Sequence, residues 1–131
     1  MSRENVELAE RIMRALGRRD ADELVAVADA EVEWHSFFAL AEGGYRGHTG
    51  TRKYMRDLSD AFEVGVAEID DGLGVGNTVV LVGRLRYRGK GSGVESATPT
   101  GWILKFRDGR ITYFRAFRDP EHALEAVGLR E

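Results

Sequence analysis

The chain has 131 residues, of which 43% are hydrophobic and 31% charged, with a formal net charge of −3 and no cysteine. This length suits one domain over residues 1–131 with its own core. The slight negative charge favours neither nucleic acid nor an anionic membrane as a partner. The lack of cysteine excludes disulfides and thiolate chemistry. No apolar run reaches the roughly 20 residues that span a bilayer, and the N-terminus lacks the apolar core of a signal peptide, so we expect a cytoplasmic protein.

Two helices are predicted at the N-terminal end. Over residues 3–18 apolar side chains recur at helical spacing, with charged residues between them. These apolar residues are Val6, Ala9, Ile12, Met13 and Leu16. Arg18 and Arg19 suit the end of this helix, and Asp20 and Glu23 have the spacing of a capping box, which predicts the start of a second helix. We expect a helical hairpin with a tight turn.

A strand and a third helix are predicted in the middle of the chain. Residues 30–38 are rich in strand formers, and alternation puts Trp34 on one face and His35 on the other. A loop with several glycines follows, and residues 49–62 are predicted to form a helix. Its side chains aligned at i, i+4 and i+8 are Tyr54, Leu58 and Phe62.

After residue 64 the period of the apolar residues changes to two, which predicts strands. The expected strands span residues 64–70, 78–88, 95–107 and 110–118. The expected turns lie at Asp71-Gly72, at the glycine-rich residues 89–93 and at Asp108-Gly109. Short turns imply antiparallel pairing. With a closing helix after Pro120, the chain is predicted to be an α+β domain with its helices packed on one sheet face.

Two motifs resemble a known family. Residues 45–50, Tyr-Arg-Gly-His-Thr-Gly, precede the third helix, and residues 108–111 and 119–129 end the chain. Their order is similar to the SnoaL-like branch of the nuclear-transport-factor-two-like superfamily, over essentially the whole chain. The resemblance implies a curved, mostly antiparallel, cystatin-like sheet wrapped around helices as a cone. It also implies a mouth that admits a small apolar ligand, and a homodimer formed through the outer sheet face.

The resemblance does not name a reaction, because that superfamily includes polyketide cyclases, ketosteroid isomerases, epoxide hydrolases and dehydratases. A ketosteroid isomerase of the usual type needs a carboxylate base, a tyrosine and a protonated carboxyl. Laid over that pattern, this chain has Trp34 in place of the base, Ile12 in place of the tyrosine and Trp102 in place of the second acid. We therefore exclude steroid isomerisation of that type. Any catalysis is expected to be cofactor-independent acid/base chemistry.

Aromatic side chains predict an apolar site inside the cone, because aromatic walls with few polar groups are typical of small-molecule pockets. The residues predicted to line it are Trp34, Tyr54, Leu58, Trp102, Leu104, Phe106 and Phe117. Tyr54 would supply a hydroxyl donor. The alternative is that these side chains fill the cone and leave no cavity.

His35 is the best histidine candidate for catalysis, because an imidazole exchanges protons near neutral pH. Strand alternation, however, points it away from the face of Trp34, and a surface or interface histidine is the alternative. The three histidines of the chain form no i, i+4 pair. This argues against a metal site, and no cofactor is expected.

Arg115 and Asp119 complete the candidate polar machinery. If alternation holds along the last strand, both share a face with Phe117. SnoaL-like cyclases are understood to use an aspartate near the late strands as a general acid/base, and Asp119 is nearest by position. An aspartate before Pro120 is also a preferred helix cap. Arg115 could orient an anionic or carbonyl group, or pair with Glu33 or Asp119.

Arginine also alternates along one predicted strand, at Arg84, Arg86 and Arg88. We expect these side chains to pair across strands with acidic neighbours such as Glu68 and Asp70, and not to bind nucleic acid, since the overall charge is acidic.

These patterns predict a small-molecule-binding domain with an apolar, aromatic-lined cone, which could be a lyase, isomerase or hydrolase acting on an apolar oxygenated substrate. The alternative is a non-enzymatic, homodimeric ligand-carrier or accessory domain. A cavity around Trp34 and Trp102 would favour the first, and a filled cone would favour the second.

Overall fold

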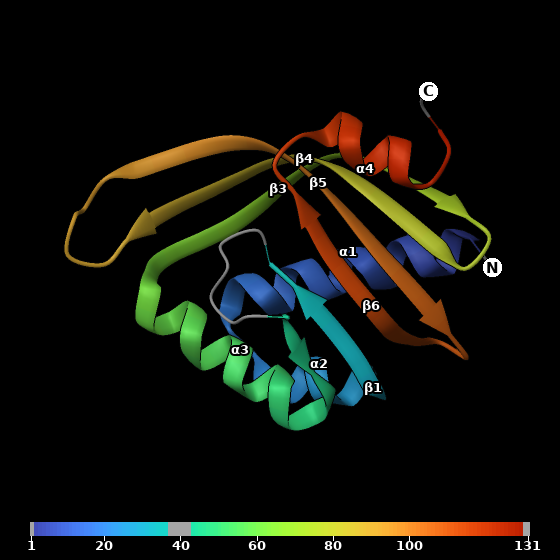
Figure 1. Cartoon of the computed structure of the whole chain (residues 1–131), viewed down its shortest axis with the longest axis horizontal. Coiled ribbons are helices and arrows are strands. Elements are labelled where there is room, and N and C mark those ends of the chain that lie inside the picture. The colour runs from blue at the N-terminus through green and yellow to red at the C-terminus, as the bar shows by residue number, and fades with distance from the viewer. Residues whose placement is uncertain (1, 37–42, 130–131) are drawn as a thin grey trace.

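The computed structural model describes residues 2–36 and 43–129, which form four helices and six strands (Figure 1). The helices are α1 (Ser2–Arg18), α2 (Ala21–Val27), α3 (Gly47–Ala61) and α4 (Pro120–Ala126). The strands are β1 (Ala28–His35), β2 (Tyr45–Arg46), β3 (Phe62–Val75), β4 (Thr78–Gly89), β5 (Glu95–Arg107) and β6 (Arg110–Phe117). The predicted order of helices and strands is confirmed except for β2, which lies in the segment expected to be a loop. Phe37 and Phe38, expected to continue β1, lie outside the described residues. None of the described helices is long and apolar enough to cross a membrane.

The six strands form one curved sheet in the order β2-β1-β6-β5-β4-β3. All neighbours pair antiparallel except β1 and β6, which run parallel. A parallel pair needs a long connection, and here α3 and the β3–β5 meander provide it. The pairing sets Trp34 of β1 beside Phe114 of β6. The predicted α+β fold with a curved, mostly antiparallel sheet is confirmed.

The two faces of the sheet carry different layers. Helices α1, α2 and α3 lie on the inner face, whereas α4 lies across the outer face (Figure 1). Along β4, Val79 and Leu81 belong to the inner core, and Val80 and Val82 to the smaller core under α4, as alternation along a strand requires. The expectation that the helices share one face is therefore correct for three helices and wrong for α4.

Two local features allow α4 to pack on the outer face. Asp119 is its N-cap and accepts a hydrogen bond from the Glu121 N–H at 3.0 Å, with Pro120 at the first helical position. The helix also lies very close to β5 at Gly101. A Cβ there would be 2.7 Å from the Cβ of Ala123, so a side chain at position 101 would push α4 away.

The hairpin between β3 and β4 differs from the prediction. The expected turn at Asp71-Gly72 lies inside β3, which continues to Val75, and a register shift between Ile69 and Asp71 accommodates it there. The turn itself falls at Gly76, whose φ of 61° lies in the left-handed region that glycine adopts readily. An aspartate-glycine pair is compatible with a bulge as well as with a turn, so the motif alone could not distinguish them.

A second bulge changes which face of β6 looks inward. In the β5–β6 ladder Lys105 pairs with Tyr113, but Phe106 pairs with Ile111, so Thr112 is the extra residue. Both Ile111 and Phe114 are consequently buried in the inner core, which strict alternation forbids. Residues after the bulge have the opposite orientation to the one that counting from Ile111 predicts.

The arginines of β4 form the predicted cross-strand pairs. Arg84 Nη2 lies 3.5 Å from Glu68 Oε1 and Arg84 Nη1 lies 4.0 Å from Asp70 Oδ2, while Arg86 Nε lies 3.8 Å from Glu68 Oε2. All of these side chains are exposed, so each pair contributes little to stability. Their role is to neutralise charge along the outer edge of the β3–β4 hairpin.

Candidate functional site

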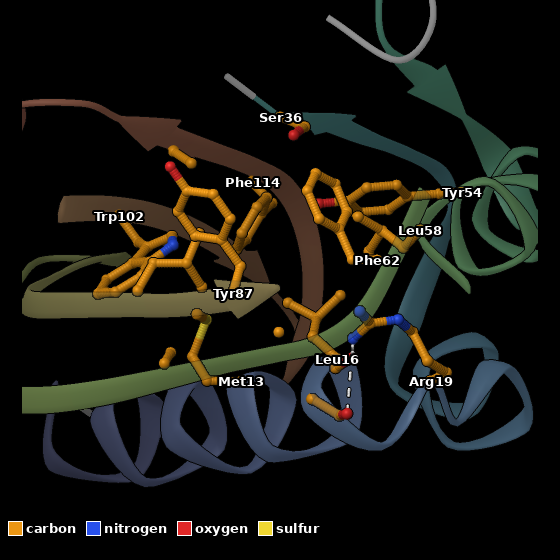
Figure 2. A pocket seen from close by; sticks show the side chains of 15 residues that line it. Met13, Leu16, Arg19, Ser36, Tyr54, Leu58, Phe62, Tyr87, Trp102 and Phe114 are labelled. Carbon is orange, nitrogen blue, oxygen red and sulfur yellow. Dashed lines mark hydrogen bonds between the residues drawn. The ribbon is translucent and has the colours of Figure 1, made fainter. Parts of the chain in front are cut away.

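A small cavity, partly open to solvent, lies between the end of α1, α3 and the inner face of the sheet (Figure 2). Its free space is about 60 Å³, which is room for a few water molecules. Its apolar lining residues are Met13, Leu16, Gly17, Leu58, Phe62, Gly65, Ala67, Leu85, Trp102, Phe114 and Ala116. Its polar lining residues are Arg19, Ser36, Tyr54 and Tyr87. The cone is thus neither empty nor completely filled.

A buried aromatic cluster of Trp34, Tyr45, Tyr54 and Phe114 borders this cavity. The ring centroids of Trp34 lie 5.3 Å from Phe114 and 5.9 Å from Tyr54, and Tyr45 stacks on Tyr54 at 4.9 Å. Trp34 is 0% exposed, and its indole Nε1 donates a hydrogen bond to Thr51 Oγ1 at 2.8 Å. That bond satisfies the indole N–H and allows the side chain to serve as core.

Among the described residues of the cavity lining, Arg19 is the one cation. It follows α1 directly, where its N–H donates to the Leu16 carbonyl at 3.1 Å and the Asp20 N–H donates to the Ala15 carbonyl at 3.0 Å. This pair of bonds is a Schellman motif, which places Arg19 at the position that normally carries glycine. Its φ of 58° is accordingly in the left-handed region. The backbone at this point aims the side chain toward the sheet (Figure 2).

The guanidinium of Arg19 is only partly satisfied. Nη1 donates to the Leu16 carbonyl at 2.9 Å. Nε is buried and is the only such side-chain nitrogen or oxygen without a hydrogen-bond partner in the part of the chain that the structure describes. Burial lowers the pKa of Arg19, and the nearby Tyr54 opposes this effect, but an arginine remains charged at neutral pH. A cation with an unused donor therefore borders an apolar cavity.

Tyr54 and Ser36 supply two hydroxyls to the same cavity, and they are hydrogen-bonded to each other. Burial raises the pKa of Tyr54 to about 12, and the smaller effects of Ser36 and Arg19 oppose this. The phenol is therefore protonated at neutral pH and can donate a hydrogen bond. It cannot serve as a base there, because that would require the tyrosinate.

Three of the predicted wall residues line the cavity: Tyr54, Leu58 and Trp102. Three others, Trp34, Leu104 and Phe106, are buried in the surrounding core and are not among the lining residues. Phe117 is on the opposite face of the sheet, packed with the core under α4. Phe117 was predicted to point into the cone, and this was wrong because the bulge at Thr112 reverses the orientation of the residues after it. The residues of β6 that line the cavity are Phe114 and Ala116.

The three predicted polar residues lie away from the cavity. Asp119 caps α4. Arg115 follows the bulge, so it borders a shallow hollow on the outer sheet face, where its guanidinium carbon lies 5.1 Å from the ring centre of Phe117. His35 faces away from Trp34, as alternation predicted, with Nε2 at 3.1 Å from Glu33 Oε1 and its ring against Tyr113. The structure does not bring the three together at the cavity.

Sequence reasoning predicted three of the lining residues, and those that it missed include Arg19, Ser36, Phe114 and Ala116. The helix-ending arginine pair was visible, but an arginine after a helix usually reaches solvent. Its inward direction follows from a left-handed backbone that is typical of glycine and not of arginine. Among the described residues, no group of three or more His, Cys, Asp or Glu side chains is placed to hold a metal ion.

Comparison with known proteins places this geometry in a family context. The family model described as "SnoaL-like domain" matches residues 9–114. Comparison with curated proteins gives no match.

Solved structures share the fold over nearly their whole length. An NTF2-like protein from Burkholderia xenovorans is 25% identical, with a TM-score of 0.77, covering 96% of this chain and 97% of that one. TerC, co-crystallised with polyporic acid, is 18% identical with a TM-score of 0.76, covering 93% and 96%. A protein with a ketosteroid-isomerase-like fold from Catenulispora acidiphila, in complex with trimethylamine, is 17% identical with a TM-score of 0.71, covering 88% and 87%.

Proposed function

Because the chain belongs to the SnoaL-like domain family, within the NTF2-like superfamily, we propose that it binds a small, largely apolar and oxygenated molecule in the cavity between α1, α3 and the sheet. The observation that carries the proposal is the lining of this cavity. It is mostly apolar, with a few polar groups converging on it from the residues that follow α1 and β1, from α3 and from β4, which is the usual composition of a small-molecule site. Two proteins of the same fold were crystallised with small molecules, polyporic acid and trimethylamine.

The lining favours binding over acid/base turnover. Among the described residues it contains neither a carboxylate nor an imidazole, and the Tyr54 hydroxyl is held in its protonated form. A general base must lie within hydrogen-bond reach of the proton that it removes. The catalytic roles of Asp119, His35 and Arg115 stay a prediction to which this geometry adds no support. A ligand-carrier or accessory domain is therefore the function we propose first, and a lyase, isomerase or hydrolase the second.

Neutral fragments test this proposal directly. We would titrate isobutyramide and benzamide into the protein and follow the methyl resonances of Met13, Leu16 and Leu58, which line the cavity. Saturable shifts confined to these methyl groups are the expected result. The variant Ala116→Leu fills the cavity, because Ala116 lines it, whereas Ala97→Leu adds the same volume at an exposed site on β5. Binding should be lost in the first variant and retained in the second. Equal binding by both variants would refute the site.

We also propose a homodimer formed through the outer sheet face. Leu73 and Val75 of β3 are 45% and 41% exposed and border the hollows on either side of α4. Exposed apolar side chains of this size, gathered on one face, are typical of protein interfaces. Light scattering of the wild-type chain and of Leu73→Lys tests this proposal. A dimeric wild type and a monomeric, folded variant are expected, and a monomeric wild type would contradict the proposal.

A further inference from the structure

We propose that the molecule bound in this cavity carries a single oxyanion, which the guanidinium of Arg19 binds. The inference rests on the proposed small-molecule site and specifies the chemical class of its ligand: a small apolar body bearing a carboxylate, phenolate or enolate oxygen.

The first argument is the unused donor. A guanidinium has five N–H donors and no acceptor. Here Nη1 is bonded to the Leu16 carbonyl, while Nε is buried without a partner among the described residues. A buried donor without an acceptor lowers stability by the full desolvation cost of that group. An oxygen atom in the cavity would not reach the enclosed Nε, but it would bond to the part of the guanidinium that lines the cavity and offset this cost for the group as a whole.

The second argument is charge. The described residues that line the cavity include no carboxylate that could neutralise Arg19. Arg19 is half-buried and also borders a hollow beside α3, so solvent stabilises its charge only in part, and a counter-charge in the cavity would stabilise it further. Because Arg19 is also the only cation among the lining residues that the structure describes, one negative charge balances them. A phosphate dianion would bring an excess of negative charge into an apolar space.

The third argument is that the chain holds Arg19 in this position at a conformational cost. The long side chain of a surface arginine can extend to water, yet this one occupies a backbone conformation with φ of 58° that directs it to the cavity. Non-glycine residues in such conformations concentrate at ligand sites, where surrounding structure maintains the strain. Opposite Arg19, position 65 on β3 is glycine, and a Cβ there would lie 2.9 Å from Nη2. Both the backbone of Arg19 and the facing strand thus make room for the guanidinium.

The surrounding groups define the rest of the ligand. The planar fork of a guanidinium matches a planar pair of oxygens or a single anionic oxygen better than an ammonium does. The protonated Tyr54 hydroxyl can add a donor to the same oxygen. The remaining lining is apolar, and the free space of about 60 Å³ limits the enclosed part of a ligand to a few atoms. A short or single-ring organic acid meets these conditions.

Matched acids and amides test the proposal, because each pair has nearly the same shape and differs in charge. We would measure the dissociation constants of isobutyrate against isobutyramide and of benzoate against benzamide. In the wild type we expect the acid of at least one pair to bind about tenfold tighter than its amide, the ratio that a charge-assisted hydrogen bond supplies. In Arg19→Gln the dissociation constants of the acid and of its amide should differ by no more than about twofold. Arg19→Lys, which keeps the charge and loses the fork, should give an intermediate ratio.

Arg18→Gln is the control. Arg18 is the neighbouring arginine, it is exposed, and it pairs with Asp20. Its replacement changes the net charge by the same amount as Arg19→Gln, and it should leave the ratio of the amide and acid dissociation constants unchanged. A second readout is the absorbance of 4-nitrophenol, which reports its ionisation. The pKa of bound 4-nitrophenol should be lower in wild type and in Arg18→Gln than in Arg19→Gln. This lowered pKa would show that the site binds a phenolate as well as a carboxylate. If Arg19→Gln does not fold, Gly65→Ala displaces the same guanidinium and replaces it in every comparison.

Three outcomes overturn the inference, and they differ in what they leave standing. If amides bind in the cavity and acids bind no better, the small-molecule site stands and the oxyanion assignment is wrong. If neither acids nor amides shift the cavity methyl resonances, the proposed function fails and the inference fails with it. An acid preference that survives in Arg19→Gln would also refute the assignment, because another group would then be responsible.

Discussion

Arg19 and Gly65 lie directly against each other in the cavity lining, and β3 passes close to the guanidinium because residue 65 has no side chain. An added Cβ would lie 2.9 Å from Nη2 of Arg19. This contact joins the end of α1 to β3, and it gives the glycine a role that its strand propensity does not explain, since glycine weakens a strand interior.

The first prediction concerns Gly65→Ala. The new methyl group should push the flexible end of Arg19 aside without a backbone clash, so stability should stay within about 1 kcal/mol of wild type. The preference for benzoate over benzamide should fall about tenfold. Calorimetric titration measures the preference and urea unfolding measures the stability. An unchanged preference would show that the guanidinium position has no influence on the ligand.

The second prediction separates the backbone strain of Arg19 from the role of its side chain. Both Arg19→Gly and Arg19→Ala remove the guanidinium, but only glycine adopts φ of 58° without steric cost. Arg19→Gly should therefore be more stable than Arg19→Ala by about 1 kcal/mol. The same pair at Arg18, the last residue of α1, should have the reverse order, since alanine is the better helix former. Denaturant unfolding of the four variants tests both orders, and the same order at both positions would contradict the assignment of strain.

The third prediction concerns the hydrogen bond that fixes Trp34. Thr51→Val keeps the shape of the side chain but leaves the buried indole N–H without its acceptor, so it should lower the free energy of unfolding by about 1–3 kcal/mol. Thr51→Ser keeps the hydroxyl and should lose less. Tryptophan fluorescence should report the change in environment of Trp34. Equal stabilities of the two variants would mean that the hydroxyl has no structural role.

The fourth prediction is a pH dependence at Asp57. The Tyr45 hydroxyl donates a hydrogen bond to Asp57 Oδ2 at 2.5 Å, and Lys53 Nζ lies 3.0 Å from the same oxygen; these bonds hold the pKa of the carboxyl below its usual value. A carboxyl with a lowered pKa in the folded state stabilises the protein above its unfolded pKa of about 3.9, and the effect is lost as the pH falls through the folded pKa.

Asp57→Asn should consequently be less stable than wild type by about 1 kcal/mol at pH 7, a value reduced for the partial exposure of the pair. The difference should shrink below about pH 4. Thermal unfolding between pH 3 and pH 7 measures it. Asp60→Asn, three residues further along α3, is the control. A difference independent of pH would show that the charge of Asp57 is not what stabilises the fold.

The fifth prediction assigns a structural role to Asp119. Its carboxylate caps α4, so Asp119→Ala should lower the free energy of unfolding by about 1 kcal/mol, and Asp119→Ser should restore most of it. Ligand affinity at the cavity should not change in either variant. Loss of binding or turnover with stability unchanged would instead support the acid/base role that the resemblance implied.

Much of the fold could be predicted because its signals are local. The helical spacing from Val6 to Leu16 and the spacing of Asp20 and Glu23 predicted α1 and α2, and alternation predicted the strands after residue 64. Tyr54, Leu58 and Trp102 line the cavity, and their inward-facing positions on α3 and β5 follow from periodicity. The turn at Asp71-Gly72 was wrong, since the same residues fit a bulge within a longer strand.

The sequence by itself therefore determined most of the helices and strands, their order along the chain, and the family to which they are similar, but not β2 or the full length of β3. The tertiary structure decided which side chains share the cavity. Thr112 bulges only because β6 pairs with β5 in a particular register, and that one residue moves Phe117 and Arg115 to the outer face. Arg19 reaches the cavity only because its backbone is left-handed and a glycine on β3 faces it. The spacing of apolar residues reflects the local preference of one helix or strand. The register of paired strands, and the close approach of one segment to another, depend on residues far apart in the chain.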